Sequence, residues 1–424
     1  MCVKHELLLY LQKITDKGVQ MTLSEELTWR GFVNQTTYPD LSSLDGTPIS
    51  FYWGVDPSAR SMQIGNLAAA MMVRHFIDHG HKAYLLVGGA TGMIGDPDGK
   101  KDERNLLTLE DIATNKAAIA QQYKKVFAGQ DFTIVDNYDW FKDMNYLDFL
   151  RTIGKNVPLS QMLGREFVQS RIGSDGSGIS YAEFSYSLIQ GYDFLHLFQE
   201  HNVTLQVCGA DQWGNSIAGV DLIRRIEGKE ANVYSVPLIV NKATGVKFGK
   251  SEGGAVWVDS ELTSVYRFYQ FWLNLDDEGV IDYMKIYTLL NKEEVDAIEA
   301  EQSANPASRV AQKRLAHEVT TLVHGAERTA SVEKVTSVLF GDAEFNSLDD
   351  KDLDELAGEI PTAAVGDTII NALVSSGTAS SNGEARRLIE SGAVSVNGEK
   401  VSEDAKLEGT SLIKKGKNNF VLVR

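Results

Sequence analysis

The sequence predicts an α/β protein with three parts: a doubly wound parallel sheet of the Rossmann-like type, an α-helical domain and a small α+β domain. Three observations support this fold class. In the first part of the chain, short apolar runs are followed by polar or glycine-rich turns and then helices, an order typical of parallel sheets. Helical patterns then follow one another without a strand between them. Finally, residues 361–424 combine a short basic helix with a hairpin signal.

The parallel sheet is predicted from four apolar runs, at residues 49–55, 83–87, 203–207 and 233–240. Helices are predicted at residues 67–79, 108–127 and 216–226. Gly80 directly follows the first of these helices, which is a common stop signal. Ligands of such sheets bind at the carboxyl ends of the strands. We therefore expect the functional site in the loops that follow the strands.

The helical part is predicted from five consecutive segments, at residues 263–273, 278–290, 292–302, 309–323 and 326–339. Further on, Asp342 to Glu359 holds eight carboxylates and one lysine, so we expect a linker there. A strand entering the Asn397-Gly398 turn predicts a hairpin. The predicted limits are 1–24 for an N-terminal extension of uncertain status, 25–252 for the Rossmann-like domain, 253–341 for the helical domain, 342–360 for the acidic linker and 361–424 for the last domain.

Composition narrows the function classes. The 424 residues carry a net charge of −17, which argues against a protein that coats nucleic acid indiscriminately. The last fifteen residues contain Lys414, Lys415, Lys417 and Arg424 and no acid, which suits local contact with a polyanion. No apolar run is long enough to span a bilayer, and no membrane association is expected.

Cysteine is scarce. Only Cys2 and Cys208 are present, and no histidine or cysteine cluster has zinc spacing. We expect neither a disulfide framework nor a metal site, and a reducing compartment, the cytoplasm, is the expected location. The first residues have weak features of a targeting segment, and either Met1 or Met21 could be the start.

Two segments far apart in the chain suggest chemistry on a phosphate. Residues 54–66 follow an apolar run and open a helix, so their backbone N–H groups could face an anion. Residues 247–251, Lys-Phe-Gly-Lys-Ser, place two lysines three residues apart. A P-loop would need a glycine at position 244, where Thr244 stands, and a solvated basic loop remains the alternative. Together the two segments favour an enzyme that splits a nucleoside triphosphate by positioning and charge.

Two further patterns point to a polar pocket. Gly89, Gly92 and Gly95 form a glycine-rich turn after a predicted strand, which is either a ligand loop or simply a tight turn. Tyr186, Gln190 and Asp193 have the i, i+4, i+7 spacing of one helix face. An aromatic residue at such a spacing usually belongs to the core, but two polar partners on the same face are hard to bury without a bonding partner.

Taken together, these segments resemble the bacterial-type tyrosyl-tRNA synthetases, which are class I aminoacyl-tRNA synthetases. The resemblance covers nearly the whole chain from about Glu26. Its most specific parts are residues 87–97, 184–194, 209–215 and 247–251, the last of which is similar to the KMSKS signature of the class. Residues 361–424 resemble the small RNA-binding domain that the family shares with a ribosomal protein. The middle helices would form the anticodon-binding domain.

The resemblance implies a tyrosine–tRNA ligase that activates L-tyrosine with ATP and transfers it to tRNA(Tyr). It implies ATP as a substrate with Mg²⁺ as its counterion, no tightly bound cofactor, and a homodimer with Tyr181 near the subunit interface. Basic residues of the last domain would contact tRNA phosphates: Arg386, Arg387, Lys414, Lys415 and Lys417.

The resemblance also assigns site residues. The tyrosine pocket would consist of Tyr52 and Asp193 at the phenol, Asp96, Tyr186 and Gln190 at the ammonium, and Gln206 and Gln212, the latter near the carboxylate. The ATP site would be lined by Gly54, Asp56, Gly65, Gly209, Asp211 and Lys250. The groups acting on the phosphates would be Lys247, Lys250, Ser251, Gln63, Asn66 and Ser58, with Lys100 and Arg104 from a second loop.

This chain departs from the family pattern at three positions. The first signature of the family has two histidines where this chain has Gln63 and Asn66. Amide nitrogens can still donate hydrogen bonds there, but they lack the charge and the pH response of imidazole. Trp53 replaces a small residue that lies against the ribose in relatives.

Two alternatives follow. The first is a catalytically degenerate, synthetase-like RNA-binding protein, which Gln63, Asn66 and Trp53 favour. Against it stand the pocket residues and both lysines of the second signature. The other is a synthetase for tryptophan, which shares the fold. The Tyr52 and Asp193 pair favours a phenol over an indole.

Overall fold

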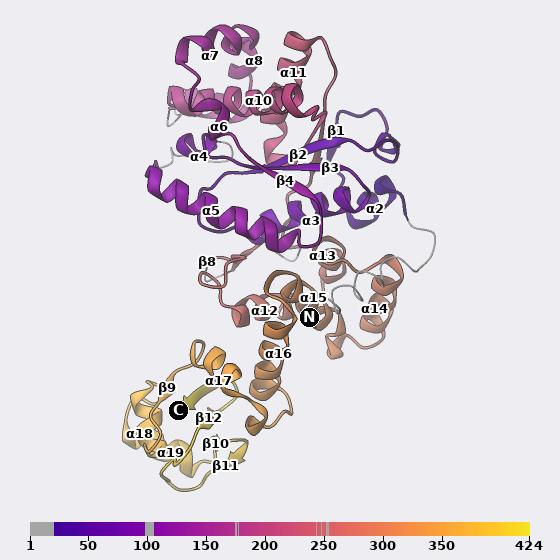
Figure 1. The fold of residues 1–424 in the computed structure, drawn as a ribbon. Helices are drawn as coiled ribbons and strands as arrows, with labels where there is room; N and C mark the ends of the chain where they lie inside the picture. Colours follow the sequence, from indigo (N-terminus) through magenta and orange to yellow (C-terminus); the bar gives the residue numbers. More distant parts are fainter. Residues whose placement is uncertain are drawn as a thin grey trace. The chain divides into compact units, whose positions relative to one another are not determined.

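The computed structural model describes residues 21–97, 106–173, 176, 178–242, 244–246, 248–251 and 254–424 (Figure 1). The chain forms two compact units. One comprises the residues up to Leu262 together with Asp276–Ala311, and the other comprises Thr263–Leu275 together with Gln312–Arg424. In the described part of the chain, no helix is long and apolar enough to cross a membrane.

A six-stranded sheet forms the centre of the first unit. Its strands are β1 (Gln35–Thr36), β2 (Ser50–Val55), β3 (Lys82–Val87), β4 (Phe132–Asp136), β5 (Leu205–Gly209) and β6 (Asn232–Val236). Their order is β1-β6-β5-β2-β3-β4. All neighbours are parallel except β1, which runs antiparallel to β6. The predicted doubly wound parallel sheet is confirmed.

Helices cover both faces of this sheet (Figure 1). Consecutive residues of β2 show the two sides: the Tyr52 ring lies 5.3 Å from that of Phe194 in α10 (Tyr181–His201), and the Trp53 ring lies 5.5 Å from that of Tyr123 in α5 (Leu109–Val126). The helix α11 (Trp213–Glu227) packs along α10, and α3 (Ile64–Asp78) packs on β3. Because both faces are covered, β2 and β3 are almost continuously apolar.

Polar caps set where the helices of this unit begin. Thr108 and Asp111 form a capping box at the start of α5, and Ser180 and Glu183 form one at the start of α10. Such boxes satisfy backbone N–H groups that have no partner within the helix. Glu183 is also paired with Arg171 at 2.8 Å, and both side chains are buried. The first turn of α10, which precedes Tyr186, is therefore held firmly.

The remaining elements of the first unit are short or lie outside the sheet. They are α2 (Leu23–Arg30), η1 (Leu41–Leu44), α4 (Thr91–Ile94), α6 (Tyr138–Phe141), α7 (Tyr146–Thr152), η2 (Gly154–Asn156), α8 (Leu159–Leu163), α9 (Glu166–Ile172), η3 (Ala210–Gln212), β7 (Lys250–Ser251), β8 (Gly254–Ala255), α13 (Val280–Tyr287), α14 (Lys292–Ala304) and η4 (Pro306–Ser308). Because α2 begins at Leu23, folded structure already starts within the stretch expected to be an extension.

The second unit contains helices followed by a small mixed sheet. Its helices are α12 (Val265–Leu273), most of α15 (Val310–His324), α16 (Ala326–Phe340), η5 (Phe345–Ser347), α17 (Asp350–Ala357), α18 (Ile369–Ser375) and α19 (Asn382–Glu390). The strands β9 (Thr362–Ala363), β10 (Val394–Val396), β11 (Glu399–Lys400), β12 (Ser411–Lys415) and β13 (Asn419–Val423) have the order β11-β10-β12-β13-β9. Asn397 and Gly398 both have positive φ angles, as the predicted hairpin turn requires.

The expected linker at residues 342–360 is wrong, because this stretch folds. Leu356 of α17 is fully buried in a cluster with Leu339 of α16 and Leu412 and Leu422 of the sheet. Asp352 is buried as well and accepts a hydrogen bond of 2.6 Å from Lys334 Nζ. The predicted helical domain is also divided, since α13 and α14 belong to the first unit and α12 and α16 to the second.

Candidate active site

The loops after four neighbouring strands and one face of α10 bring polar side chains together. Asp56 follows β2, Thr91 and Asp96 follow β3, and Asn137 follows β4. Gln212 follows β5 in the same way. Since these strands are parallel, their carboxyl ends share one edge of the sheet, where ligands of such folds bind. The predicted place of the site therefore agrees with the connectivity of the sheet.

Asp56 is held by two hydroxyl groups. Tyr186 donates to its Oδ2 at 2.7 Å, and Thr91 donates to its Oδ1 at 2.6 Å. A Cβ atom on Gly88 would lie 2.3 Å from Asp56 Oδ1, so the turn after β3 must be glycine for this contact to exist. Burial raises the pKa of Tyr186 well above its usual value, and nearby Asp56 raises it further. Tyr186 is thus a neutral donor that joins α10 to the loop after β2.

Asp193 is a fully buried carboxyl group with two donors. Asn137 Nδ2 lies 3.1 Å from its Oδ2, and Trp140 Nε1 lies 2.9 Å from its Oδ1. Burial raises the pKa of Asp193 well above its usual value, and the two donors oppose this by favouring the ionised form. Each carboxylate oxygen has two lone pairs, so Asp193 can accept a further hydrogen bond from a ligand.

Three buried oxygen atoms near Asp193 have no hydrogen-bond partner within the described part of the chain. They are Tyr52 Oη, Gln190 Oε1 and Gln206 Oε1. Tyr52 and Gln206 are register partners in β2 and β5, so their side chains share the face covered by α10. Gln190 lies one turn before Asp193 in α10. Buried polar atoms are normally satisfied, so this group indicates a place for a polar ligand.

Asp96 and Gln212, which the resemblance assigns to different ends of the amino acid, contact each other. Gln212 Nε2 donates to Asp96 Oδ2 at 2.5 Å, and Asn215 Nδ2 donates to Gln212 Oε1 at 3.2 Å. Arg165 in turn donates to Asn215 Oδ1 and to the carbonyl of Gly214, both at 2.6 Å. The loop after β5 is therefore fixed by Asp96 on one side and by Arg165 on the other. At its start, the carboxylate of Asp96 lies beside the amide of Gln212.

The first signature segment begins α3 and is paired with the segment after β8. The N–H of Ile64 donates to the carbonyl of Val256 at 3.2 Å. Contrary to the expectation, this N–H therefore does not face an anion. The N–H of Gln63 donates to Asn66 Oδ1 at 3.0 Å. Because its oxygen is used in this way, the Asn66 amide is oriented, and its nitrogen is the end that can donate to a ligand.

The second signature segment is described only in part. Lys247, Lys100 and Arg104 lie outside the described residues. Lys250 and Ser251 form the main chain of β7, which pairs with β8. Gly249 has a φ of +87°, and a Cβ atom there would lie 2.5 Å from Ile64 Cγ1. The second signature segment thus passes directly against the first residue of α3, and only glycine permits this approach.

The other predicted residues lie around the same edge. Gly54 is the exposed residue of β2, Gly65 is exposed in the first turn of α3, and Ser58 is exposed in the loop between these two elements. Gly209 ends β5, and Asp211 is exposed in η3. Their positions are compatible with the ATP contacts implied for them, which stay predictions.

Trp53 occupies the core and does not project from it. Its side chain is 3% exposed, and its ring lies 5.5 Å from that of Tyr123 and 6.4 Å from that of Phe127. The bulk of the indole is therefore accommodated between the sheet and α5. This packing explains how a large side chain fits at this position.

Two residues of the site, Asn137 and Trp140, were not predicted from the sequence. Both follow β4, the edge strand, whose alternation of polar and apolar residues is short. Asn137 also donates to Thr91 Oγ1 at 3.1 Å, and so it connects Asp193 with the hydroxyl that holds Asp56. A polar residue directly after a strand could have indicated Asn137 only if β4 had been recognised as a strand, and Trp140, which lies in α6, carries no such signal.

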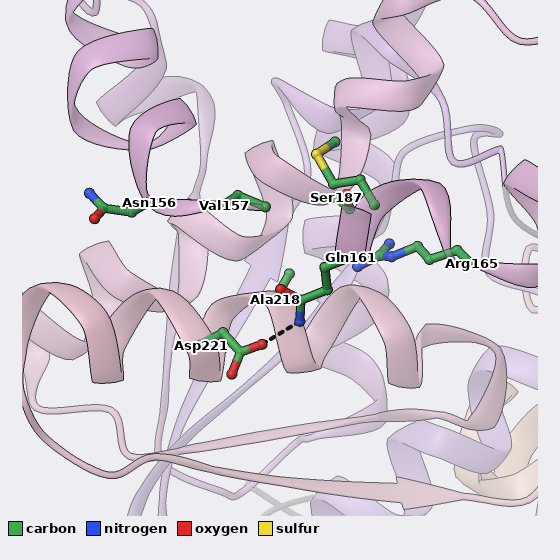
Figure 2. Close-up of a pocket in the computed structure, with 8 residues that line it drawn as sticks. Asn156, Val157, Gln161, Arg165, Ser187, Ala218 and Asp221 are labelled. Atoms are coloured by element: carbon green, nitrogen blue, oxygen red, sulfur yellow. Dashed lines mark hydrogen bonds between the residues drawn. The ribbon is translucent and has the colours of Figure 1, made fainter. Parts of the chain in front are cut away.

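A cavity separate from this site lies between α8, α10 and α11 (Figure 2). Its lining includes Arg165, Gln161 and Asp221, and Gln161 donates a hydrogen bond to Asp221. Its volume is about 10 Å³, enough for about one water molecule. It cannot hold an amino acid or a nucleotide. Among the described residues, no group of three or more histidine, cysteine or acidic side chains could bind a metal ion.

Comparison with known families gives the class of the protein. A family model described as tRNA synthetases class I (W and Y) matches residues 44–341, and a model of the tyrosine–tRNA ligase SYY-like C-terminal domain matches residues 352–423. The chain therefore belongs to the class I tRNA synthetases for tryptophan and tyrosine. As sequence analysis predicts, it is an enzyme of the ligase class.

Its relatives place the chain in the tyrosine–tRNA ligase family. It is 42% identical over 421 residues to the tyrosine–tRNA ligase of Levilactobacillus brevis, covering 95% of this chain and 99% of that protein. It is 40% identical over 431 residues to that of Flavobacterium johnsoniae, covering 95% and 99%.

Solved structures agree with this assignment. The C-terminally truncated mitochondrial tyrosyl-tRNA synthetase of Aspergillus nidulans has a TM-score of 0.67 at 29% identity, covering 78% of this chain and 97% of that one. A tryptophanyl-tRNA synthetase from Encephalitozoon cuniculi, at 14% identity and a TM-score of 0.54, shares the fold alone. The predicted fold class and family are confirmed.

Proposed function

We propose that the protein activates L-tyrosine with ATP, releases pyrophosphate, and transfers the tyrosyl group to the 3′ end of tRNA(Tyr). The observation that carries this proposal is the buried group of Tyr52, Gln190, Gln206 and Asp193, whose first three members have unpaired oxygens within the described part of the chain. A ligand that carries both a phenol and an ammonium supplies the donors that these acceptors require.

The pocket selects tyrosine over phenylalanine by its buried polar atoms. Asp193 and Tyr52 meet the phenol, while Asp96, Gln190 and the Tyr186 oxygen receive the ammonium. Phenylalanine would fill the same space but leave the two phenol partners without a hydrogen bond. An unsatisfied buried polar group costs about 1–3 kcal/mol, and more if it is charged. Tryptophan lacks the para hydroxyl and has a larger ring, so the same pair disfavours it.

The first reaction step needs positioning and charge, and no covalent bond to the enzyme is formed. An oxygen of the tyrosine carboxylate attacks the α-phosphorus of ATP, a new P–O bond forms, and the bond to the bridging oxygen of pyrophosphate breaks. Negative charge grows on the leaving pyrophosphate. Lys247, Lys250 and Ser251 contact this group in the transition state, with Lys100 and Arg104 from the second loop, and such contacts raise the rate.

The remaining predicted residues bind the rest of ATP. Gln63 and Asn66 donate from their amides to the phosphates, and Ser58 adds a hydroxyl. Gln212 lies beside the carboxylate and the α-phosphate. The part of the site that takes the ribose and the base is lined by Gly54, Gly65, Gly209 and Asp211. Asp56, which accepts hydrogen bonds from Tyr186 and Thr91, also lines the ATP site. Mg²⁺, bound to the phosphates of ATP, supplies charge neutralisation when present.

We also propose a homodimer. Large apolar side chains are exposed on α7, α8, α9 and α10: Tyr146 at 59%, Leu147 at 73%, Leu159 at 60%, Ile172 at 47% and Tyr181 at 61%. The hydroxyl groups of Tyr146 and Tyr181 lie 3.3 Å apart. Exposed apolar patches of this kind mark protein interfaces, and a two-fold axis would bury each patch against its copy.

The double variant Leu147→Glu with Tyr181→Glu is expected to be a monomer at micromolar concentration, because it places charges in a buried apolar contact. Analytical ultracentrifugation of the variant and the native protein measures this. Leu109→Glu, at a residue that is 68% exposed at the start of α5, is the matched control and should remain dimeric. A native protein that sediments as a monomer would refute the dimer.

The second unit is proposed to bind tRNA, but not with all five predicted basic residues. Lys414 Nζ lies 3.4 Å from the carbonyl of Leu339, and Lys415 Nζ lies 2.6 Å from that of Thr378. These two lysines are half-buried and engaged within the protein. Arg386, Arg387 and Lys417 are exposed, so they are the better candidates for phosphate contacts.

Replacing Arg386 and Arg387 by glutamine is expected to weaken tRNA binding and to reduce the slope of log K against log salt by about 2, since each phosphate contact contributes about 1. Binding titrations between about 50 and 200 mM salt give this slope. Lys415→Gln is the control, which should lower stability but leave the slope unchanged. An unchanged slope in the double arginine variant would remove these residues from the interface.

The activity is tested by charging. The protein, ATP and tyrosine are incubated with a tRNA(Tyr) transcript, and tyrosyl-tRNA is measured against phenylalanine and tryptophan as competing amino acids. We expect tyrosine to be attached and the other two to be excluded. Binding of the tRNA without charging would instead support a degenerate RNA-binding relative.

The scarcity of cysteine supports a reducing, cytoplasmic location.

A further inference from the structure

The chain around the second signature segment is a hairpin with a well-defined stem. The N–H of Phe248 donates to the carbonyl of Ile239 at 2.9 Å, and the N–H of Asn241 donates to that of Val246 at 2.8 Å. The N–H of Gly245 closes the turn onto the carbonyl of Asn241 at 2.7 Å. Lys247 lies outside the described residues, but its neighbour Phe248 is described and is 5% exposed.

One side chain outside the hairpin contacts both sides of its stem. The Tyr283 hydroxyl accepts a hydrogen bond from the N–H of Lys242 at 3.0 Å and donates one to the carbonyl of Val240 at 3.1 Å. Its ring stacks on that of Phe248, with centroids 4.3 Å apart and an angle of 23° between the planes. Tyr283 thus contacts the segment before the turn through its hydroxyl and the segment after the turn through its ring.

Tyr283 itself stands on a firmly fixed helix. It belongs to α13, and Arg30 of α2 donates to the carbonyl of Lys285 in the last turn of that helix at 2.8 Å and to those of Thr288 and Leu290 just after it, at 3.1 and 3.0 Å. Arg30 is 3% exposed and Tyr283 is 3% exposed. Because α13 is anchored in this way, the hydroxyl and the ring of Tyr283 have little freedom to follow a displaced hairpin.

We infer that Tyr283 is a positioning residue for the lysines of the second signature: it fixes the hairpin stem so that residues 247–251 meet the leaving pyrophosphate. The inference deepens the proposed function and depends on it. Stacking on Phe248 places a rigid contact next to Lys247 in sequence and two residues before Lys250. Since lysines that act on a transition state lose effect when misplaced by about 1 Å, a loosened stem lowers the rate of activation.

The test is Tyr283→Phe, which keeps the ring and removes both hydrogen bonds of the hydroxyl. We expect kcat for tyrosine-dependent ATP–pyrophosphate exchange to fall about tenfold, the effect of two lost hydrogen bonds. The KM for tyrosine should be unchanged, because the tyrosine pocket is untouched. Amide hydrogen exchange within residues 239–249 should become faster in the variant.

Tyr234→Phe is the matched control. Its hydroxyl is also buried and donates to the carbonyl of Phe32 at 3.0 Å, so the substitution costs a comparable hydrogen bond away from the hairpin. The control should leave both kcat and the exchange of residues 239–249 unchanged. Equal kcat values in the two variants, or unchanged amide exchange in Tyr283→Phe, would overturn the inference.

The wild-type protein separates this inference from the proposed function. An absence of pyrophosphate exchange in the wild type contradicts the proposed activation of tyrosine and with it the catalytic part of this inference. Amide exchange still decides in that case whether Tyr283 holds the hairpin. Normal wild-type activity with no effect of Tyr283→Phe contradicts the inference alone.

Discussion

Asp193→Asn is expected to lower kcat/KM for tyrosine by about 100- to 1000-fold, equivalent to about 3–4 kcal/mol. The amide that replaces the carboxylate is neutral, and its nitrogen would face either Trp140 or Asn137, both of which are donors. The variant therefore loses a charge-assisted bond to the substrate phenol and creates a buried donor–donor contact, and each of these costs 1–3 kcal/mol or more.

The KM for ATP should change far less than that for tyrosine, because Asp193 lies in α10 on the tyrosine side of the proposed site. Steady-state exchange kinetics with each substrate varied give both constants. Glu200→Gln, an exposed residue of the same helix, is the matched control and should behave as the native protein does. Equal losses for tyrosine and ATP would refute the assignment of Asp193 to the phenol.

Tyrosine binding should also weaken as the pH falls through the pKa of Asp193. Burial raises that pKa well above the usual range, and the ionised carboxylate is a stronger acceptor for the phenol than the protonated acid is. The loss should thus begin at a higher pH than an ordinary aspartate would give. Equilibrium titrations of tyrosine binding against pH measure this. Binding that strengthens on acidification would show that a protonated Asp193 is the binding form.

Lys250→Ala is expected to lower kcat for tyrosine activation by about 100- to 1000-fold while the KM for tyrosine stays within about threefold. A charge that meets the leaving pyrophosphate only in the transition state affects kcat, not substrate binding, and removal of one such group typically costs 10²–10³ in rate. Pre-steady-state measurement of adenylate formation isolates this step from later ones.

The first signature segment provides the comparison for Lys250. Gln63→Ala and Asn66→Ala remove neutral amide donors and should cost only about tenfold each, since a neutral hydrogen bond is worth about 0.5–1.5 kcal/mol. Lys292→Ala, at an exposed lysine paired with Asp296, controls for the loss of any positive charge. A loss in the Asn66 variant as large as that in Lys250→Ala would mean that the first segment carries as much transition-state charge as the second.

The central strands and their loops could be predicted because their signals are local. A strand covered on both faces is a run of apolar residues such as Phe51–Trp53, and the glycines at 89, 92 and 95 mark the turn that follows the next strand. The spacing of Tyr186, Gln190 and Asp193 likewise indicated a polar helix face. These features are visible in a few consecutive residues.

Features that depend on tertiary packing could not be predicted. The edge strand β4 is short and half-exposed, so the partners of Asp193 that follow it, Asn137 and Trp140, had no recognisable context. The stretch 342–360 is acidic in composition, but Leu356 supplies the apolar contact that folds it. Tyr283 contacts Val240 and Lys242, which lie about forty positions earlier in the chain. No local pattern reveals such a contact.

The central claim, that this chain activates tyrosine, is tested most directly by ATP–pyrophosphate exchange without tRNA. Radiolabelled pyrophosphate, ATP and Mg²⁺ are incubated with the full-length protein, with and without L-tyrosine. We predict label in ATP only when tyrosine is present, and none with phenylalanine. Exchange no greater with tyrosine than without it would contradict the claim, because the buried oxygens of Tyr52, Gln190 and Gln206 would then serve a pocket that does not lead to an adenylate.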